Sequence, residues 1–252
     1  MSDLPMLPVS KMRALRPYFP KTRGLKRVDD RRVLSGIVYV IRHGLQWKDA
    51  PSGYGPHKTL YNRFIRWSRL GVFARIFSVL TGNAGVPEEL MIDSTHLKAH
   101  RTAASLLKKG VPARRIGRTR GGLNSKLHAV CDGHGRPVAM LLTEGQMSDH
   151  KGAALLLPRL PSARHLVGDR GYDSNCFRRN LTERGIEPCI PSTKSRKVPI
   201  PHDKSRYRRR HKVENMFGRL KDWRRIATRY DRCAHTFFSA ICLAATVIYW
   251  TP

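Results

Sequence analysis

The stretch YRRRHKVENMFGRLK, from Tyr207 to Lys221, holds one carboxylate, Glu214, among six arginine and lysine side chains. The surrounding pattern predicts a long helix over residues 206–223. At about 100° per residue, four side chains fall within an arc of roughly 60°: Tyr207, Arg210, Glu214 and Lys221. This face could bind a divalent metal through its carboxylate and phosphate through its cations. The alternative is a local Arg210–Glu214 ion pair, worth about 0.3–0.5 kcal/mol.

Two further acids lie upstream, each at the end of an apolar run. Asp93 ends LMID and Asp169 ends HLVGD, and polar residues follow both. We predict that each aspartate ends a buried strand, at the sheet edge where the sites of α/β proteins gather. Taken singly, such an aspartate is more often a turn or cap residue. Together with Glu214, the two aspartates would bring three carboxylates to one site.

The sequence between these acids predicts an α/β domain. Residues 126–145, KLHAVCDGHGRPVAMLLTEG, have the pattern of two strands joined by a turn at residues 132–135. Helices are predicted over residues 149–160 and 174–185, and strands within residues 163–173 and 186–192. A basic, proline-containing loop follows. Strands that alternate with helices behind a leading hairpin indicate a mixed sheet in three layers.

Residues 1 to about 85 have a helical pattern instead. Val33, Ile37, Val40 and Ile41 recur at helical spacing, and Gly44 is a plausible C-cap. A later helix places Leu60, Phe64 and Trp67 on one face and its basic residues largely off that face. Two interpretations stay open: a helix–turn–helix-like DNA reader, or a helical bundle with solvated arginines. The segment TGNAGVPEE, residues 81–89, has the composition of a linker.

The composition points to a polyanionic partner. Lys and Arg total 48 against 18 Asp and Glu, which gives a formal net charge of +30. This excess would strain a compact protein by self-repulsion unless a polyanion neutralised it, so nucleic acid is the expected partner. The alternative is an anionic membrane surface, and no polybasic amphipathic anchor or lipidation motif supports it.

Other compositional signals point to the cytoplasm. Five scattered cysteines with no CxxC pair suit a reducing compartment. The N-terminus lacks the apolar run of a signal peptide. The longest apolar segment, residues 237–250, is shorter than the roughly 20 residues that a spanning helix needs. We therefore expect a cytoplasmic protein, without a membrane partner, that acts on DNA or RNA.

The spacing in the first stretch is also that of a known motif. Tyr207, Arg210, Glu214 and Lys221, separated by two, three and six residues, resemble the YREK signature of IS4/IS5-type insertion-sequence transposases. LMIDST and VGDRGYDS resemble the first and second aspartate motifs of that group. Residues from about 85 onward resemble the catalytic domain of the IS5 family throughout.

This resemblance implies a fold and a catalytic triad. The fold is a ribonuclease-H-like (retroviral-integrase-like) mixed sheet flanked by helices, preceded by an N-terminal helical domain. The triad, carried over position by position, is Asp93, Asp169 and Glu214. The domains implied are an end-binding domain over residues 1–85 and a catalytic domain over residues 86–252.

The implied reaction is metal-dependent cleavage at terminal inverted repeats and strand transfer into target DNA. The triad would bind two Mg²⁺ or Mn²⁺ ions, and a homodimer or larger assembly on double-stranded DNA is expected. Candidate DNA contacts are Tyr207, Arg210, Lys221, Arg118, Arg120 and Lys126. For the last three, a solvated basic loop is an equal alternative.

Two rival functions fit the same charge. One is a catalytically inactive or domesticated DNA-binding protein derived from a transposase, and the intact acids weigh against it. The other is a ribosomal-type RNA-binding protein, which does not require those acids. The remaining nearby acids are weaker site candidates: we expect Asp132 in the hairpin turn, Asp149 at a helix N-cap, and Asp173 in a loop where it caps the next helix.

Overall fold

The computed structural model describes residues 4–20, 28–105 and 114–251. Its contacts divide the chain into two compact units. Unit 1 comprises Met1–Leu80, His100–Arg114 and Leu220–Pro252, and unit 2 comprises Thr81–Ala99 and Arg115–Arg219. The last part of the chain therefore groups with the N-terminal helices.

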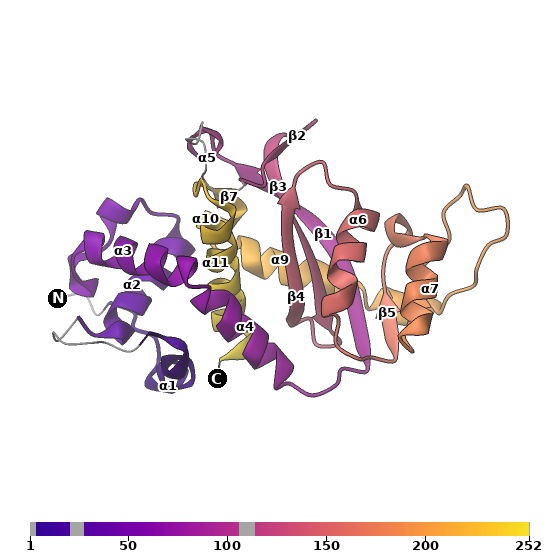
Figure 1. Cartoon of the computed structure of the whole chain (residues 1–252), viewed down its shortest axis with the longest axis horizontal. Helices are drawn as coiled ribbons and strands as arrows, with labels where there is room; N and C mark the ends of the chain where they lie inside the picture. The colour runs from indigo at the N-terminus through magenta and orange to yellow at the C-terminus, as the bar shows by residue number, and fades with distance from the viewer. Residues whose placement is uncertain (1–3, 21–27, 106–113, 252) are drawn as a thin grey trace. The chain divides into compact units, whose positions relative to one another are not determined.

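Unit 1 is mainly helical. Its longer helices are α1 (Val9–Leu15), α2 (Asp30–His43), α3 (His57–Arg69), α4 (Val72–Gly82) and α11 (Ala234–Ala245) (Figure 1). Its shorter elements are η1 (Arg16–Tyr18), η2 (Trp47–Asp49), η3 (Ser52–Tyr54), α5 (Arg101–Ala104), α10 (Arg224–Ala227), β7 (Thr228–Arg229) and the π-helical turn η6 (Thr246–Trp250). Within the described segments, every helix is too short or too polar to span a membrane.

The helical pattern predicted for the first 85 residues is confirmed where the structure describes them. The side chain of Asp29 accepts hydrogen bonds from the first amides of α2, and Gly44 ends the helix at a φ of 75°. A left-handed φ of this kind favours glycine, which explains the predicted C-cap. Helix α3 buries the apolar side chains predicted for its inner face: Leu60, Phe64 and Trp67.

Unit 2 is built on a mixed sheet. Its strands are β1 (Glu89–Ala99), β2 (Gly117–Thr119), β3 (Gly122–Asp132), β4 (Pro137–Glu144), β5 (His165–Val167) and β6 (Glu187–Cys189). They follow the order β2-β3-β1-β5-β6, and β4 also pairs with β3. The β1–β3 and β3–β4 pairs are antiparallel, whereas β1–β5 and β5–β6 are parallel.

The predicted hairpin is the β3–β4 pair. Its turn is closed by Asp132, whose Oδ1 accepts hydrogen bonds from the amides of His134 and Arg136, both at 2.9 Å. Gly135 adopts a φ of 78° in this turn. The expected place of Asp132 is therefore confirmed, and its carboxylate has a structural task.

Helices cover both faces of the sheet in unit 2. These helices are α6 (Asp149–Leu156), α7 (Asn175–Glu183), α8 (Lys204–Arg208) and α9 (His211–Lys221), with the 3₁₀ turns η4 (Leu157–Arg159) and η5 (Arg170–Tyr172). Successive side chains of a strand point to opposite faces. On β1, Ser94 bonds to Asp149 of α6, whereas Asp93 pairs with Arg210 between α8 and α9. Helix α6 and the α8–α9 pair therefore lie on opposite faces, as a three-layer domain requires.

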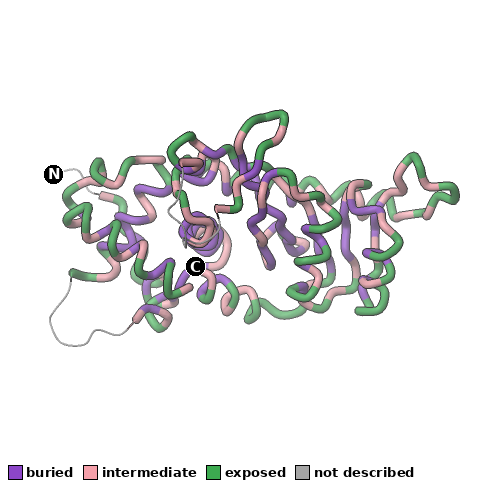
Figure 2. The backbone as a smooth tube through the Cα atoms, turned by 45° about the horizontal axis from the view of Figure 1, so that its top comes forward, coloured by how far each residue is buried: buried purple, intermediate pink, exposed green. Residues whose placement is uncertain are grey.

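The burial pattern follows these layers. In Figure 2 the strands are mainly purple, for buried, and the helices show green on their outer sides. One apolar cluster joins β1, β5, α6 and α7, and it includes Leu90, Ile92, Leu156, Leu166 and Leu181. The core thus fixes the central strand that carries Asp93.

Two predicted boundaries differ in the structure. Strand β1 does not end at Asp93 but continues to Ala99, because β3 pairs with it as far as Lys98. The predicted helix over residues 206–223 is two helices, α8 and α9. Tighter i→i+3 hydrogen bonds run through the junction, including Arg210 N to Tyr207 O and Lys212 N to Arg209 O. The single-helix prediction was therefore wrong at Arg209 and Arg210.

Candidate active site

The sheet register brings Asp93 and Asp169 alongside each other. Strands β1 and β5 are parallel, and Met91 pairs with Val167, the last residue of β5. Asp93 lies two residues after Met91, and Asp169 lies two residues after Val167, on neighbouring segments of the same chain. Asp169 does not end the strand as predicted, but lies two residues beyond the end of β5, and its Oδ1 accepts a 2.8 Å hydrogen bond from the amide of Gly171.

The environment of Asp93 opposes its negative charge. Burial raises the pKa of Asp93, and the nearby charge of Asp169 raises it further. The Ser94 amide, 2.7 Å from Asp93 Oδ1, and the Arg210 guanidinium act in the other direction. Because burial and the Asp169 charge both oppose the negative charge of Asp93, a cation beside Asp93 is favoured, and the Arg210 guanidinium supplies one.

Arg210 joins two of the predicted carboxylates. Its Nη1 lies 2.8 Å from Asp93 Oδ2, and its Nη2 pairs with Glu214 Oε1. The Tyr207 ring lies beside the same guanidinium, with its centroid 6.0 Å from Arg210 Cζ. The local Arg210–Glu214 pair exists, as one interpretation of the sequence expected. It is also one half of a bridge that reaches Asp93 from a position 117 residues away.

A second acid on β1 holds the helix junction in place, and the sequence patterns did not reveal it. Glu89 is buried, and its Oε1 pairs with Arg206 Nη1 at 3.3 Å and with Arg209 Nη2 at 3.0 Å. Glu89 and Asp93 are four residues apart, so they point to the same face of β1. These two acids pair with arginines of α8 and of the α8–α9 junction. The four-residue spacing of Glu89 and Asp93 was the sequence signal that could have identified Glu89.

On the opposite face of β1, a second polar cluster surrounds Asp149. Ser148 is the N-cap of α6, so the prediction that Asp149 caps this helix was wrong. Asp149 Oδ1 accepts from Ser94 Oγ at 2.6 Å and pairs with Lys126 Nζ at 2.8 Å. Although burial acts to raise it, the pKa of Asp149 is lowered by these bonds. Burial and the Lys126 charge lower the pKa of His128 to about 4.

Lys126 belongs to this buried cluster and not to an exposed DNA-contacting loop. Its side chain is buried, and its ammonium also bonds to the Met147 carbonyl at 3.1 Å. Arg118 and Arg120, by contrast, are exposed at β2 and the turn that follows it. Lys221 ends α9 and is half-buried, which lowers the pKa of its ammonium. Of the three loop cations predicted to follow DNA, two are thus at the surface and one is enclosed.

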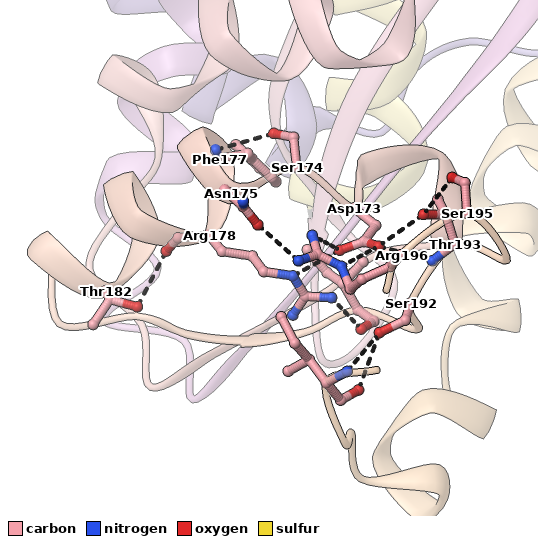
Figure 3. A network of polar contacts seen from close by, with 12 residues as sticks. Asp173, Ser174, Asn175, Phe177, Arg178, Thr182, Ser192, Thr193, Ser195 and Arg196 are labelled. Atoms are coloured by element: carbon pink, nitrogen blue, oxygen red, sulfur yellow. Dashed lines mark hydrogen bonds and ion pairs between the residues drawn. The ribbon is translucent and has the colours of Figure 1, made fainter. Parts of the chain in front are cut away.

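Asp173 is not the helix cap that we predicted. Ser174 caps α7, and its Oγ accepts a hydrogen bond from the amide of Phe177. The carboxylate of Asp173 is instead enclosed by Arg178 and Arg196, with Thr193 as a further donor (Figure 3). It is therefore a structural anchor, and not a fourth acid of the site.

The donor set fits a divalent cation in its chemistry. Carboxylate oxygens are the ligands that Mg²⁺ prefers, and Asp93 and Glu214 already share one cation, the Arg210 guanidinium. Over the described residues, no three His, Cys, Asp or Glu side chains are close enough to bind one metal ion. In this structure the Arg210 guanidinium therefore occupies one oxygen of Asp93 and one oxygen of Glu214.

Two protein-family models match the chain. The model described as "Putative transposase of IS4/5 family (DUF4096)" matches residues 9–77. The model described as "Transposase DDE domain" matches residues 84–249. The second match alone spans more than half of the chain.

Two curated relatives match about half of this chain. The chain is 31% identical to the "Putative transposase for insertion sequence element IS402" of Burkholderia cepacia, over 56% of this chain and 73% of that protein. It is 30% identical to the "Putative transposase for insertion sequence element IS6501" of Brucella ovis, over 50% of this chain and 98% of that protein.

The fold is also that of a solved transposase structure. The piggyBac transposase, solved as a synaptic complex with hairpin DNA, aligns with a TM-score of 0.54 over 95% of this chain and 70% of its own. The sequences are 10% identical, so this likeness concerns the fold alone. It is consistent with a ribonuclease-H-like sheet flanked by helices.

Proposed function

The chain belongs to the DDE transposases of insertion sequences, in the IS4/5 group, and we propose that Asp93, Asp169 and Glu214 are its catalytic carboxylates. Members of this family are enzymes that cut and join DNA strands, and DNA transposition is the function of this chain. One observation carries the triad assignment: Arg210 contacts Asp93 and Glu214 at once, while the register brings Asp169 beside Asp93.

Transposases with this domain generally use divalent metal ions. We propose that Asp93, Asp169 and Glu214 would hold two Mg²⁺ or Mn²⁺ ions. The contribution of such ions would be activation of the attacking hydroxyl and stabilisation of the leaving oxygen. Arg210 would leave the carboxylates and bind a DNA phosphate, because a guanidinium binds carboxylate and phosphate through the same fork of N–H donors.

The remaining assignments concern DNA. Tyr207, Arg210, Lys221, Arg118 and Arg120 are proposed phosphate contacts, and the enclosed Lys126 is left out. Residues 1–85 are proposed to recognise the terminal inverted repeats, ahead of a catalytic domain over residues 86–252. A homodimer or larger assembly in the bacterial cytosol would bring two transposon ends together.

Three substitutions test the triad: Asp93→Asn, Asp169→Asn and Glu214→Gln. Each removes one negative oxygen ligand while keeping the size of the side chain. With Mg²⁺ or Mn²⁺, we expect cleavage of a duplex carrying the ends of this insertion sequence to fall by more than the roughly 10- to 100-fold that loss of an outer-shell partner costs. DNA binding, measured by fluorescence anisotropy, should persist.

Glu183→Gln is the matched control, because it neutralises an exposed acid of α7 that pairs with Arg179 at 3.7 Å. This variant should cleave like the wild type. Full strand transfer by any one of the three triad variants would contradict the assignment. A wild-type protein that binds the ends but cleaves with neither metal would indicate a catalytically inactive DNA-binding protein.

A further inference from the structure

A long loop lies between the last strand of the sheet and the helices that carry Arg210 and Glu214. Residues 190–203, all within the described part of the chain, connect β6 to α8 without a helix or strand of their own. This is the orange loop that projects at the right of Figure 1. Loops of this length in compact domains usually have a function of their own.

The loop is fixed to the body of unit 2 through one buried carboxylate. The side chain of Asp173 has an exposed fraction of 0%. Its Oδ2 accepts from the amide of Thr193 at 2.7 Å, and its Oδ1 pairs with Arg196 Nη2 at 2.7 Å (Figure 3). Arg178 adds a second cation to the same carboxylate, with its Nε 2.9 Å from Asp173 Oδ1. Hydrogen bonds to a charged group are stronger than those between neutral groups, so this attachment is strong.

Further bonds restrain both ends of the loop. Arg178 Nη2 donates to the Ile190 carbonyl at 2.6 Å. The amide of Ile200 donates to Ser192 Oγ at 2.8 Å, which closes the base of the loop. Arg196 Nη1 donates to Asn175 Oδ1 at 2.7 Å. The segment from Ser192 to Ile200 is therefore held in one shape.

This arrangement separates the loop's cations by role. Arg196 faces inward to Asp173 and Asn175, whereas Lys194 and Lys197 are exposed on either side of it. Between and beside them are exposed Ser195 and Val198, the latter with an exposed fraction of 76%. The contacts of Arg196 thus hold the backbone that carries Lys194 and Lys197. The entropy cost of ordering this backbone is therefore already met before a ligand binds.

The exposed side of the loop also borders a polar hollow. A cavity of about 460 Å³ lies between the loop and the start of α7, lined by groups that include Ser174, Asn175, Thr193, Ser195 and Lys197. Hydroxyl, amide and ammonium groups are common donors to phosphate oxygens. With Asp173 neutralised by its arginines, the loop and hollow present net positive charge.

The two attachments of the loop relate it to the proposed triad. Its anchor, Asp173, comes four residues after Asp169, and its C-terminal end leads into α8, which carries Tyr207. Strands β5 and β6 are parallel, so Asp169, which follows β5, and the loop, which follows β6, leave the sheet at the same edge.

We propose that residues 192–200 form a DNA-binding surface, in which Lys194 and Lys197 contact backbone phosphates and Arg196 acts as a positioning residue. This proposal rests on the proposed transposase function. The phosphates could belong to the transposon end or to the target duplex, which share the same chemistry.

The first test is the salt dependence of DNA affinity in K194A/K197A. Each lost phosphate contact lowers the slope of log Kobs against log[salt] by about 0.9. The double variant should therefore show a slope smaller by about 2. Its loss of affinity should be about tenfold larger at 50 mM than at 200 mM salt. A transposon-end duplex and an unrelated target duplex, measured separately, identify which DNA the loop contacts.

The matched control is R159A/R164A, which removes the same charge from exposed positions before β5, at the other end of that strand from Asp169. A slope that stays at the wild-type value on both duplexes in K194A/K197A would overturn the proposal, as would an equal change in R159A/R164A. Wild-type protein that binds neither duplex would instead contradict the proposed function.

The second test concerns the anchor. In the wild type, the bonds from Arg196 should protect the Lys194–Ser195 and Lys197–Val198 peptide bonds from trypsin. R196A should be cut there at least several-fold faster, while its near-ultraviolet circular dichroism stays that of a folded protein. Equal rates in both proteins would show that Arg196 does not position the loop.

Discussion

Asp169 and Asp173 lie four residues apart, and the fold gives them different surroundings. Asp169 accepts an amide hydrogen bond next to Asp93, so part of its carboxylate is left for a ligand. Asp173 is enclosed by two arginines. Burial acts to raise its pKa, but hydrogen bonds from Arg196, the Thr193 amide and Arg178 lower that pKa well below the ordinary value. At this scale, neighbouring partners decide which acid is available for chemistry.

Asp173→Asn should destabilise the protein by about 3–5 kcal/mol near pH 7, because it leaves two partly buried arginines without their counter-ion. The folded pKa of Asp173 is depressed, so its stabilisation is complete above its unfolded pKa of about 4 and is lost as pH falls toward the folded pKa. The difference in unfolding free energy between wild type and variant should therefore shrink from pH 6 to pH 3 in urea titrations. A difference that is constant with pH would contradict this account of Asp173.

In unit 2, two kinds of contact position helices on the sheet: close approach of a helix backbone to a strand, and ion pairs between a helix and a strand. Helix α6 packs against β3 at Gly152, where an added Cβ would overlap the ring of His128. The α8–α9 junction bends where Arg209 and Arg210 reach the two acids of β1. The break thus coincides with ion pairs across the layer, and helix propensity by itself does not account for it.

Two glycines on helices of unit 2 make a matched pair of tests. Gly152→Ala should lower the unfolding free energy by about 1–3 kcal/mol, the usual cost of overpacking, since the His128 ring must move. Gly218→Ala is the control, because the space around Gly218 on α9 is open and alanine is the better helix former. It should raise stability by about 0.5–1 kcal/mol. Thermal or urea unfolding of both variants checks the signs, and a stabilising Gly152→Ala would contradict the described packing.

Over the whole chain, charge is the dominant property. The formal charge of +30 must repel itself within each compact unit, and this repulsion weakens as salt shortens the Debye length. A DNA transposase gains from the same charge, because each phosphate it binds releases counter-ions. Binding and stability should therefore respond to salt in opposite directions.

The thermal midpoint should rise by about 3 °C or more between roughly 20 mM and 200 mM NaCl. Relief of even 1 kcal/mol of repulsion shifts the midpoint of a chain of this size by about 2–4 °C. Scanning calorimetry without DNA measures this directly, with a neutral osmolyte at matched osmolality as the control. A midpoint that falls with salt would indicate that specific ion pairs outweigh the net repulsion.

The sequence by itself determined most of the elements and the motifs, although it missed the break between α8 and α9 and the continuation of β1 past Asp93. Local periodicity was enough for α2, for the face of α3 and for the β3–β4 hairpin, because the residues that define each lie within a few turns or one hairpin. Motif spacing was enough to identify Asp93, Asp169 and Glu214 as candidates.

Only the tertiary structure decided what those residues meet. The register of β1 against β5 sets Asp93 beside Asp169, and ion pairs across more than a hundred residues bring Arg210 to Asp93 and Glu89 to Arg206. The enclosure of Lys126 and the inward turn of Arg196 are likewise long-range outcomes. Local patterns report which face of an element is buried, whereas the partner across the layer depends on how distant segments pack, and no local window contains that information.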